Sequence, residues 1–317
     1  MEKSEWIWMN GEFVAWDDAK VHVLSHGFHY GTGVFEGIRC YETERGPAIF
    51  RHRDHLDRLA MSAELYYLPL AHSMDEVREA THELIRVNKL RSCYIRPVAF
   101  RGYGEMGLFP LNAPVDVFIA VWPWGAYLGE EGQKHGIRCK VSSWRRMSAA
   151  SFIPEAKACG QYLNSILAKV ETAKAGYDEA ILLDVHGNVS EGSGENIFVV
   201  RDGRISTPHS AASILDGITA RSAVQIAADL GFEVEQRHIP RGELYLADEV
   251  FLTGTAAEIV PVREIDDHQL GPPGELTQAI QSRFFDAIKG KRDEYLEWLD
   301  FVELESETGR ITAAARP

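Results

Sequence analysis

Lys157 lies in a setting that is unusual for a lysine. It belongs to the stretch IPEAKACGQYLNS, residues 153–165, between a proline-led turn and small residues that leave room for another molecule. A lysine in such a place can act as a Schiff-base nucleophile toward a carbonyl group. The alternative is an ordinary surface lysine in a loop, because lysines are rarely buried without a partner. The other residues of the chain must decide between the two.

Two carboxylates and a phenol are candidates to assist this lysine. The segment VSEGSGEN, residues 189–196, places Glu191 and Glu195 after a strand-like run, and Tyr162 follows Lys157 by five residues. Pyridoxal phosphate needs an acidic partner for its pyridine nitrogen and a donor to its phenolate oxygen. A glutamate of this segment and Tyr162 would supply both. Taken alone, the glutamates also fit a turn that faces solvent.

Two glycine-containing segments could bind the phosphate of such a cofactor. They are LDGITAR, residues 215–221, at the start of a predicted helix, and LTGTAAE, residues 252–258, in a predicted turn. The N–H groups and the dipole of a helix N-terminus both favour an anion. Each segment alone is a weak signal, because such residues often only cap a helix. The candidate residues are Gly217, Ile218 and Thr219 in the first segment, and Thr253, Gly254 and Thr255 in the second.

Composition restricts the class of protein. The chain has 317 residues, enough for two domains that share one cleft, and its net charge of −14 makes nucleic acid an unlikely partner. We find no run of about 20 apolar residues, so we expect no membrane span and a cytoplasmic protein. Its cysteines are far apart, which predicts reduced, mostly buried thiols and neither disulfides nor a metal site. They are Cys40, Cys93, Cys139 and Cys159.

The first part of the chain predicts a mixture of strands and helices. Asn10-Gly11, between two aromatic-rich runs of residues 6–16, predicts a hairpin. Strands are expected at 92–100 and 115–124, with Pro97 restricting the first to a sheet edge or a strand end. Two helices are predicted. Residues 53–68 have Leu56, Leu59 and Ala63 on one stripe and Arg58, Met61 and Leu65 on another, so both stripes should be buried, and residues 75–89 have Ser73 or Asp75 as N-cap candidates and Val77, Ala80, Leu84 and Val87 inward.

The second part predicts hairpins with three further helices. The helices are expected at 161–175, with Leu163, Ile166, Leu167 and Val170 on the buried side, at 217–230, ending at Gly231, and at 274–291. Turns are expected at residues 186–188 and 202–203, and a strand pair around the turn at 254–255. Hairpins dominate both parts, so the predicted class is α+β with little parallel character. We predict domains at 1–121 and 137–317, joined by an irregular loop at 122–136.

Six blocks, in order and across nearly the whole chain, resemble the branched-chain amino acid aminotransferases. That family belongs to the class IV, fold type IV pyridoxal phosphate enzymes, so the resemblance implies a small α/β domain and a larger pseudo-barrel domain that binds the cofactor. The blocks are HYGTGVFEGIRCY at 29–41, YIRP at 94–97, KACGQYLNS at 157–165, SEGSGENIF at 190–198, DGITAR at 216–221 and LADEVFLTGTAAEIVPV at 246–262.

The resemblance assigns roles around pyridoxal 5'-phosphate. Lys157 would form the internal aldimine and later move the proton between the substrate Cα and the cofactor. Glu191 would face the pyridine nitrogen, Tyr162 the phenolate oxygen, and Leu215 would pack against the ring. The phosphate would be held by Arg58, Ile218, Thr219 and Thr255, with Asn196, Gly217 and Gly254 also at the cofactor. Because an unpaired guanidinium is costly on a helix face, we expect the phosphate to supply the anion that Arg58 lacks.

The same resemblance implies a pocket that accepts an aliphatic side chain and the distal carboxylate of glutamate in turn. Tyr94 and the backbone N–H groups of Thr255 and Ala256 would bind the α-carboxylate. Arg96 and Tyr30, with Tyr127, would pair with the distal carboxylate. The apolar wall and its surroundings would comprise Tyr30, Phe35, Gly37, Met106, Leu108, Trp124 and Tyr162. From pattern alone, core packing explains Phe35 and Trp124 equally well.

The implied activity is reversible transfer of the amino group from L-leucine, L-isoleucine or L-valine to 2-oxoglutarate. Some wall residues come from a neighbouring subunit in this family, so a homodimer is the least unit, and the sequence leaves a hexamer open. Related activities remain as alternatives: transamination of D-amino acids or R-configured amines, and elimination of the aminodeoxychorismate lyase type. A non-catalytic cofactor carrier is a further alternative. YIRP favours the branched-chain type, because arginine and tyrosine suit a glutamate carboxylate.

Overall fold

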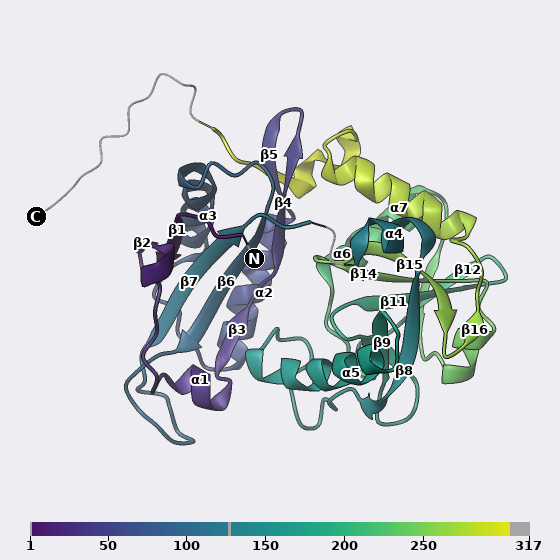
Figure 1. The fold of residues 1–317 in the computed structure, drawn as a ribbon, viewed down its shortest axis with the longest axis horizontal. Coiled ribbons are helices and arrows are strands. Elements are labelled where there is room, and N and C mark those ends of the chain that lie inside the picture. Colours follow the sequence, from purple (N-terminus) through teal and green to yellow (C-terminus); the bar gives the residue numbers. More distant parts are fainter. Residues whose placement is uncertain (1, 126–127, 305–317) are drawn as a thin grey trace, which may run out of the picture.

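Two β-sheets organise the residues that the computed structural model describes, 2–125 and 128–304. Figure 1 shows the first sheet, in purple to blue, beside the second, in green. The first sheet has the order β17-β5-β4-β6-β7-β1-β2, with β3 beside β6. Its strands are β1 (Trp6–Met9), β2 (Glu12–Ala15), β3 (Gly33–Phe35), β4 (Ile38–Thr43), β5 (Gly46–Phe50), β6 (Cys93–Arg101), β7 (Val115–Trp122) and β17 (Leu299–Phe301). We call residues 2–125 the first half of the molecule and residues 128–298 the second half.

The second sheet has the order β10-β9-β8-β15-β14-β11-β12-β13, with β16 beside β15. Three of its pairs, β8 with β9, β8 with β15, and β12 with β13, are parallel, so this sheet has more parallel character than hairpin signals predict. Its strands are β8 (Ile137–Arg145), β9 (Glu179–Leu183), β10 (Val189–Gly192), β11 (Asn196–Arg201), β12 (Arg204–Pro208), β13 (Val234–Arg237), β14 (Glu249–Gly254), β15 (Glu258–Ile265) and β16 (His268–Gln269). The predicted turns, with Gly187, Asp202 and Gly203 at positive φ, and the pair of strands around residues 255–257 are confirmed.

Seven α-helices accompany the two sheets in the described part of the chain. They are α1 (His26–Tyr30), α2 (His52–Leu65), α3 (Met74–Val87), α4 (Gly129–His135), α5 (Tyr162–Lys174), α6 (Ile218–Asp229) and α7 (Glu275–Ile288). The predicted linker at 122–136 is therefore not irregular throughout, because it contains α4. The domain bounds themselves stay a prediction, and the last strand, β17, returns from the far end of the chain to the first sheet.

The first half forms its elements largely as local signals predict. Asn10 and Gly11 both have positive φ between β1 and β2, as a tight hairpin turn requires. Ser73 caps α3, and Glu76 completes a capping box. Helices α2 and α3 bury Leu59, Leu84 and neighbouring apolar residues in one core with the sheet. The second predicted stripe of α2 is buried only at Arg58, because Met61 and Leu65 are each 38% exposed.

The prediction that Pro97 marks a sheet edge is wrong. Strand β6 lies between β7 and the pair β3 and β4, and Pro97 is opposite Ile119 in the middle of it. On the other side β3 ends and β4 has not begun, and the carbonyl of Pro97 accepts a hydrogen bond from the N–H of Glu36 in this gap. Proline therefore fits because its missing N–H falls where the neighbouring strand is interrupted.

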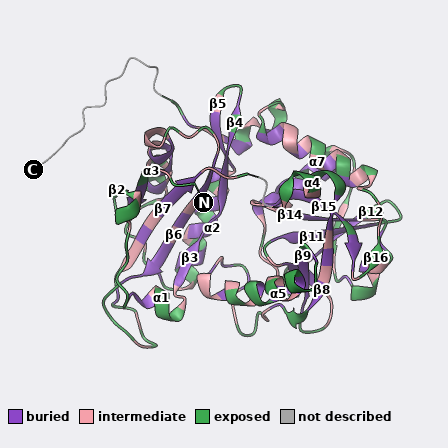
Figure 2. Cartoon of the chain, in the orientation of Figure 1, coloured by how far each residue is buried: buried purple, intermediate pink, exposed green. Residues whose placement is uncertain are grey.

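The prediction for the buried face of α5 is also wrong. Its large apolar residues are 45% to 68% exposed, and Figure 2 shows exposed and intermediate colours along the helix. The helix instead buries small residues, Ser165, Ala168 and Thr172, against the second sheet. Small side chains let the helix lie close to the strands, so the apolar stripe faces outward. The exposed residues are Leu163, Ile166, Leu167 and Val170.

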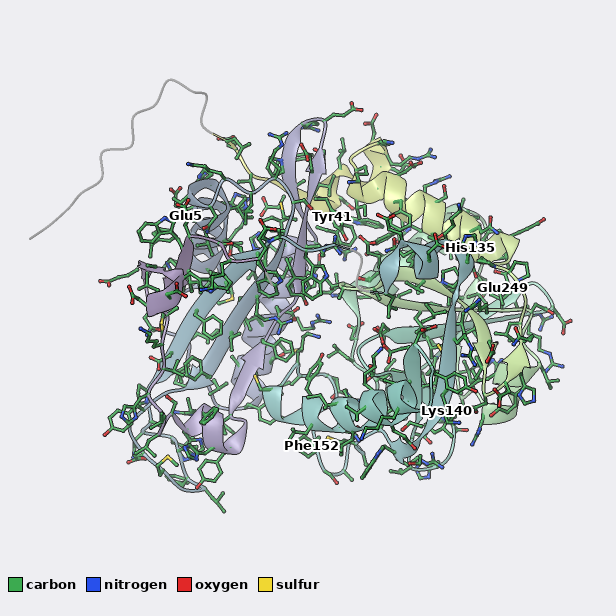
Figure 3. All side chains as sticks on the ribbon, in the orientation of Figure 1. Glu5, Tyr41, His135, Lys140, Phe152 and Glu249 are labelled. Carbon is green, nitrogen blue, oxygen red and sulfur yellow. The ribbon has the colours of Figure 1, made fainter. Side chains whose placement is uncertain are left out.

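The two halves share an apolar core, and an ionic cluster ties β17 to the first half. Tyr41, which Figure 3 labels beside β4 and β5, packs with Phe50 of the first sheet and with Phe198, Phe251 and residues of α6 and α7. Asp300 of β17 accepts hydrogen bonds from His52 of α2 and from Arg78 and His82 of α3. The end of the described chain is thereby tied to the first half, which fixes the cleft between the sheets.

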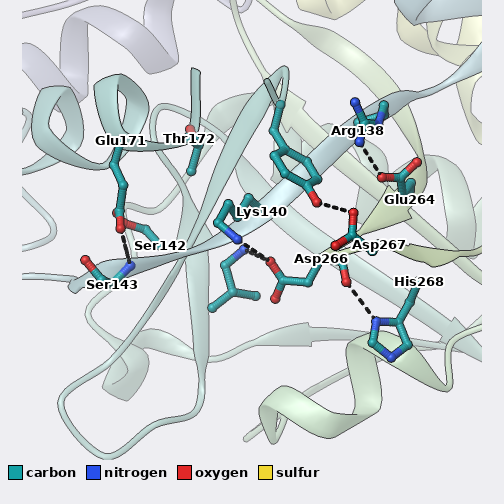
Figure 4. Close-up of polar contacts among 12 residues, drawn as sticks. Arg138, Lys140, Ser142, Ser143, Glu171, Thr172, Glu264, Asp266, Asp267 and His268 are labelled. Carbon is teal, nitrogen blue, oxygen red and sulfur yellow. Dashed lines mark hydrogen bonds and ion pairs between the residues drawn. The ribbon is translucent and has the colours of Figure 1, made fainter. Parts of the chain in front are cut away.

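Polar contacts at the outer side of the second sheet hold β8 in place (Figure 4). The Nη2 atom of Arg138 lies 2.7 Å from the Oε1 atom of Glu264, and Lys140 Nζ lies 3.7 Å from Asp266 Oδ1. These pairs join β8 to β15 and to the turn that follows it. Among the described residues no helix is long and apolar enough to cross a membrane.

Candidate active site

Lys157 is held at the junction of the two halves. Its backbone N–H donates to Ser62 Oγ of α2 at 3.0 Å, and its carbonyl accepts from the N–H of Phe35 at 3.0 Å. The residue precedes α5, and the adjoining Ala158 forms a β-bridge with Val34. Its Nζ donates a 2.7 Å hydrogen bond to the hydroxyl of Tyr162. The lysine is therefore fixed by both halves, and its amine points at the predicted phenol.

Two hollows meet at Lys157 and Tyr162. We call the first the lysine cleft, with a volume of about 30 Å³, and the second the aromatic cavity, with about 210 Å³. Gly194 and Glu195 line both. The lysine cleft is further lined by Arg146, Pro154, Ala156, Gln161, Ser165, Glu191, Ser193, Asn196 and Leu215. The aromatic cavity is further lined by Phe35, Gly37, Tyr94, Arg96, Trp122, Trp124, Thr255 and Ala256.

Glu191 presents a fixed carboxylate to the lysine cleft. Its Oε1 lies 2.6 Å from Nε of Arg146, and its Oε2 accepts from the N–H of Leu215 at 3.0 Å. Burial raises the pKa of Glu191, while the charge of Arg146 and the hydrogen bond from Leu215 oppose that rise. Asn196 Nδ2 donates to the carbonyl of Leu215 at 2.8 Å. The carboxylate is thus oriented from two sides.

A second buried carboxyl group, Glu195, lies on the boundary of the two hollows. It is 5% exposed, and its Oε2 accepts from the N–H of Gly194 at 3.0 Å. Burial, reinforced by the Glu179 carboxylate, raises the pKa of Glu195 to about 8. The Glu179 carboxylate itself accepts hydrogen bonds from Ser193 Oγ and Lys169 Nζ. At neutral pH the boundary between the two hollows therefore carries a protonated carboxyl group.

The N-terminus of α6 carries an anion site of backbone groups. Gly217 is the N-cap and no side chain caps the helix, so the first N–H groups are free of such a partner. Thr219 is buried in the first turn. A side chain at position 217 would collide with Asn196, because an added Cβ would lie 1.8 Å from its Oδ1 atom. A larger residue at position 217 would therefore have to displace the Asn196 amide, which is bonded to the Leu215 carbonyl.

Arg58 of α2 reaches this helix start, but its charge is already paired. Its Nη1 donates to the carbonyl of Asp216 at 2.7 Å, while Nε and Nη2 donate to the two oxygens of Glu36 at 2.6 and 2.9 Å. His55 Nδ1 lies 2.7 Å from the same carboxylate. Burial would raise the pKa of Glu36, but Arg58 and His55 outweigh it and hold the pKa well below its usual range. The expectation of an unpaired Arg58 is wrong, because Glu36 supplies the anion.

The turn between β14 and β15 forms one rim of the aromatic cavity. Gly254 packs against the backbone of Gly194, and a Cβ there would lie 3.2 Å from the Gly194 carbonyl oxygen. Glu258 ends the turn with a φ of 63°, an uncommon conformation for glutamate. Its buried carboxylate accepts a 2.6 Å hydrogen bond from Gln133 of α4. The backbone of residues 255–257 is thereby held facing the first half.

The opposite rim, from the first sheet, carries hydrogen-bond donors. Arg96 Nη2 donates to the hydroxyl of Tyr94 at 3.1 Å, and its guanidinium lies 4.6 Å from the ring centre of Phe35. The Nε atom of Arg96 and the Nε1 atom of Trp122 are buried without a hydrogen-bond partner among the described residues. Gly37 leaves space for Tyr94, because an added Cβ would lie 2.0 Å from its hydroxyl oxygen. This rim therefore suits an acceptor-bearing ligand.

Most of the predicted site residues line the two hollows around Lys157. The described ones that line neither hollow are Arg58, Gly217, Ile218, Thr219, Gly254, Tyr30, Met106 and Leu108. Tyr30, Met106 and Leu108 are 46%, 47% and 92% exposed in the single chain. Tyr127 lies outside the described residues. Gly217, Ile218 and Thr219 lie at the start of α6, which Arg58 contacts through the Asp216 carbonyl.

Several residues of the site were not assigned from the sequence. Glu36 lies within a block quoted for the resemblance, but its pairing with Arg58 crosses from the first sheet to α2 and has no local signal. Arg146 and Trp122 stand in segments without a motif. Glu195 was noticed as a carboxylate, but its position between two hollows depends on the fold. Such contacts join residues distant in sequence, which spacing does not reveal.

The site fits a pyridoxal phosphate cofactor. A lysine amine, a phenol and a buried carboxylate line the lysine cleft, and a helix start without a side-chain cap follows two residues after Leu215 of its lining. Residues 33–265 match the model of the family described as amino-transferase class IV. The chain belongs to the class IV aminotransferases, which use pyridoxal phosphate.

Comparison with individual proteins narrows the family. The branched-chain-amino-acid aminotransferase of Escherichia coli (strain K12) is 49% identical over 95% of this chain and 98% of its own length. That of Pseudomonas aeruginosa is 46% identical over 94% and 97%. The chain is thus a member of the branched-chain-amino-acid aminotransferase family.

Solved structures agree with this assignment. A crystal structure of the Escherichia coli branched-chain amino acid aminotransferase superposes with a TM-score of 0.93 at 49% identity, covering 95% of this chain and 100% of the other. The T.th. branched-chain amino acid aminotransferase with pyridoxamine 5'-phosphate gives a TM-score of 0.92 at 48% identity, covering 96% and 100%. The α+β fold type IV architecture and the cofactor expected from the sequence are confirmed. The alternative activities considered above are not favoured.

Proposed function

We propose that this chain transfers the amino group reversibly from L-leucine, L-isoleucine or L-valine to 2-oxoglutarate, giving branched 2-oxo acids and L-glutamate. The observation that supports this most is the position of Lys157 between the lysine cleft and the aromatic cavity. The lysine cleft offers a carboxylate and is lined by Leu215, shortly before the start of α6, whereas the aromatic cavity offers an apolar wall with donors. The first suits a cofactor, and the second suits an amino acid that has an aliphatic side chain and a carboxylate.

Lys157 and Tyr162 are the residues that we assign to proton transfer. Bound pyridoxal phosphate supplies an electron sink and carries the amino group between the two substrates. With the cofactor bound, the Lys157 amine would be the base that takes the proton from the substrate Cα and the acid that then donates this proton to the cofactor. Tyr162, bonded to Lys157 Nζ at 2.7 Å, orients that amine and donates to the phenolate oxygen.

Glu191 and Arg146 act on the pyridine nitrogen. The Glu191 carboxylate would accept the hydrogen bond of the protonated nitrogen, which would strengthen the ring as an electron sink. Arg146, whose Nε lies 2.6 Å from the carboxylate, counters the rise in the Glu191 pKa that burial causes and fixes the direction of the carboxylate. Asn196 positions Leu215, whose side chain covers the ring.

The phosphate is held by the N–H of Ile218, the hydroxyls of Thr219 and Thr255, and Arg58. Gly217 and Gly254 let backbone groups come close to it. Because Glu36 binds two nitrogens of Arg58 and Asp216 accepts from the third, the guanidinium is already oriented toward the helix start. The phosphate would therefore meet a prearranged site, with Glu36 sharing the positive charge.

Substrates bind in the aromatic cavity. Tyr94 and the N–H groups of Thr255 and Ala256 bind the α-carboxylate, and Phe35, Gly37 and Trp124 enclose the side chain. Arg96 binds the distal carboxylate of glutamate with the guanidinium N–H groups that are not engaged by Tyr94 or the Phe35 ring. When leucine is bound, the Arg96 guanidinium stays against the rings of Phe35 and Tyr94, so the same cavity accepts an aliphatic side chain.

We also propose a homodimer as the least unit, with a hexamer as a larger alternative. Tyr30, Met106, Leu108 and Tyr127 would then complete a neighbouring subunit's site, and the exposure of the first three supports this. The domain division at residues 122–136 and a cytoplasmic location belong to the same proposal. The four cysteines are free thiols, which suits a reducing compartment.

An absorption titration of the holoenzyme tests the proposed function. Adding L-leucine and L-glutamate separately should each convert the lysine-bound cofactor spectrum to that of the pyridoxamine form, while D-alanine and an R-configured arylalkyl amine should have little effect. Lys157→Ala should lose the covalent cofactor band, whereas Lys140→Ala, in another lysine of the second half, should keep it. A response chiefly to D-alanine or the amine would contradict the proposal.

A further inference from the structure

Trp122, at the wall of the proposed substrate cavity, has an indole N–H that finds no partner in the part of the chain that the structure describes. The residue ends β7 and is 7% exposed. It lines the aromatic cavity, and its Nε1 is buried with no hydrogen-bond partner among the described residues. Buried tryptophan N–H groups usually find an acceptor, because leaving the donor unpaired away from water costs free energy. A donor of this kind in a ligand cavity suggests that the ligand brings the acceptor.

The position of Trp122 indicates which part of the ligand it meets. Trp122 and Tyr94 are direct neighbours in the register of β7 and β6, and their ring centres lie 5.0 Å apart. Ala256, from the turn of the second half, packs against the same cluster. Arg96 also lies on β6, but its partner on β7 is Ala120, two residues before Trp122. Trp122 is thus placed beside the groups proposed for the α-carboxylate rather than beside the distal one.

The substrate α-carboxylate can accept one more hydrogen bond than its proposed partners supply. A carboxylate has two oxygens and accepts about four hydrogen bonds. The Tyr94 hydroxyl and the N–H groups of Thr255 and Ala256 would supply three. The indole N–H of Trp122 would supply another, and its rigid ring, held between Tyr94 and Trp124, needs little ordering to do so.

We propose that Trp122 is a substrate-binding residue whose indole N–H donates to the α-carboxylate. The inference rests on the proposed function, since it takes the carboxylate position from it. The residue would bind amino acids and 2-oxo acids alike, because both carry the same carboxylate. It would contribute little to amines that lack one.

The test compares Trp122→Phe, which removes the N–H and keeps an aromatic ring, with Trp8→Phe. Trp8 is also buried in the first sheet, but it packs in the core with α2 and α3. The probe is 4-methylvaleric acid, an unreactive carboxylate with which the T.th. relative of this chain forms a complex. Titration of holoenzyme should show about 10-fold weaker binding for Trp122→Phe and none of this loss for Trp8→Phe. The kcat with L-leucine should change little while KM rises.

A compound without the carboxylate makes the assignment specific. The half-reaction rate with 3-methylbutan-1-amine, which is leucine without its carboxylate, should be the same in wild type and Trp122→Phe. Equal losses for leucine and the amine, or unchanged binding of 4-methylvaleric acid, would overturn the proposal. If wild-type holoenzyme fails to react with L-leucine, the proposed function fails, whereas an unchanged Trp122→Phe with a reactive wild type refutes only the role of Trp122.

A second measurement follows ligand binding in the wild-type protein itself. In wild-type protein labelled with ¹⁵N at tryptophan, the indole N–H signal of Trp122 should shift downfield when 4-methylvaleric acid is added, as a new hydrogen bond forms. The chain has seven tryptophans, so assignment uses the signal missing from Trp122→Phe or, if that variant does not fold, from Trp122→Tyr. No shift at saturating ligand would overturn the proposal.

Discussion

The two walls of the site differ in how their polar groups are partnered. On the wall from the second half, Lys157 is bonded to Tyr162, and Glu191 is bonded to Arg146. On the wall from the first half, Nε of Arg96 and Nε1 of Trp122 have no partner among the described residues. The paired wall is rigid without a ligand, as suits a cofactor that stays bound. The unpaired wall gains hydrogen bonds when a ligand with acceptor atoms binds. This suits substrates, which enter and leave the site in every turnover.

This difference has an energetic meaning. An unpaired buried donor costs about 1–3 kcal/mol, which binding of an acceptor recovers. On the wall from the second half, the pairs Lys157 with Tyr162 and Glu191 with Arg146 avoid that cost, so their geometry is preorganised for chemistry. Variants of the paired wall should therefore affect turnover, and variants of the unpaired wall should affect the choice and affinity of substrates.

The largest effect after loss of Lys157 is expected for Glu191→Gln. The amide is close in size and can still contact Arg146, but it lacks the charge that holds the pyridine nitrogen protonated. We expect the cofactor to remain bound and kcat to fall by roughly 10²–10³-fold, the size typical for removal of one preorganised electrostatic group. Single-turnover kinetics with L-leucine and a measurement of cofactor content would check this. Turnover at the wild-type level would refute the assigned role.

The sequence predicts the paired wall better than the unpaired one. Lys157, Tyr162 and Glu191 lie in short blocks whose residue types indicate their chemistry. The order of these blocks resembles that in the branched-chain aminotransferases. Arg146 and Trp122 act through contacts between distant strands, which spacing does not encode. The resemblance also assigned Arg96 to the site. It did not predict that the Nε atom of Arg96 lacks a partner among the described residues.

The same contrast applies to the fold. The hairpin at residues 6–16 and the capping box at Ser73 depend on neighbours in sequence, and both are confirmed. Pro97 and α5 were misread because their burial depends on other strands: a gap between β3 and β4, and a sheet that accepts only small residues. Local propensity predicts elements, whereas the face that is buried is decided by tertiary packing.

An intermediate effect, on the unpaired wall, is expected for Arg96→Ala. Losing a charge-assisted hydrogen bond to the distal carboxylate should weaken binding of glutamate and 2-oxoglutarate by about 10–100-fold. Leucine lacks that carboxylate, so its KM should change by only a few-fold through lost contact with Phe35. Steady-state kinetics with each substrate in the same variant provide the comparison. Equal losses for leucine and glutamate would mean that Arg96 does not read the distal carboxylate.

The smallest effect is expected for Glu195→Gln, and it appears in stability as a function of pH. The pKa of Glu195 in the folded protein is raised to about 8, above the ordinary value near 4.3. The neutral carboxyl is therefore favoured in the folded state, and this contribution is complete below the ordinary pKa. As pH rises through about 8 the contribution is lost, because the folded protein must bury a charge beside Glu179.

The glutamine variant stays neutral throughout, so it should match wild type at pH 5 and melt roughly 2–5 °C higher at pH 9. Thermal melts of holoenzyme with saturating cofactor at both pH values measure this difference. Glu12→Gln, a charge change of the same size at an exposed residue, should shift the melting temperature equally at both values. A Glu195→Gln shift that is independent of pH, or larger at pH 5, would show that the paired wall does not hold this carboxyl neutral. Glu195, on the boundary between the hollows, would then be ionised at neutral pH.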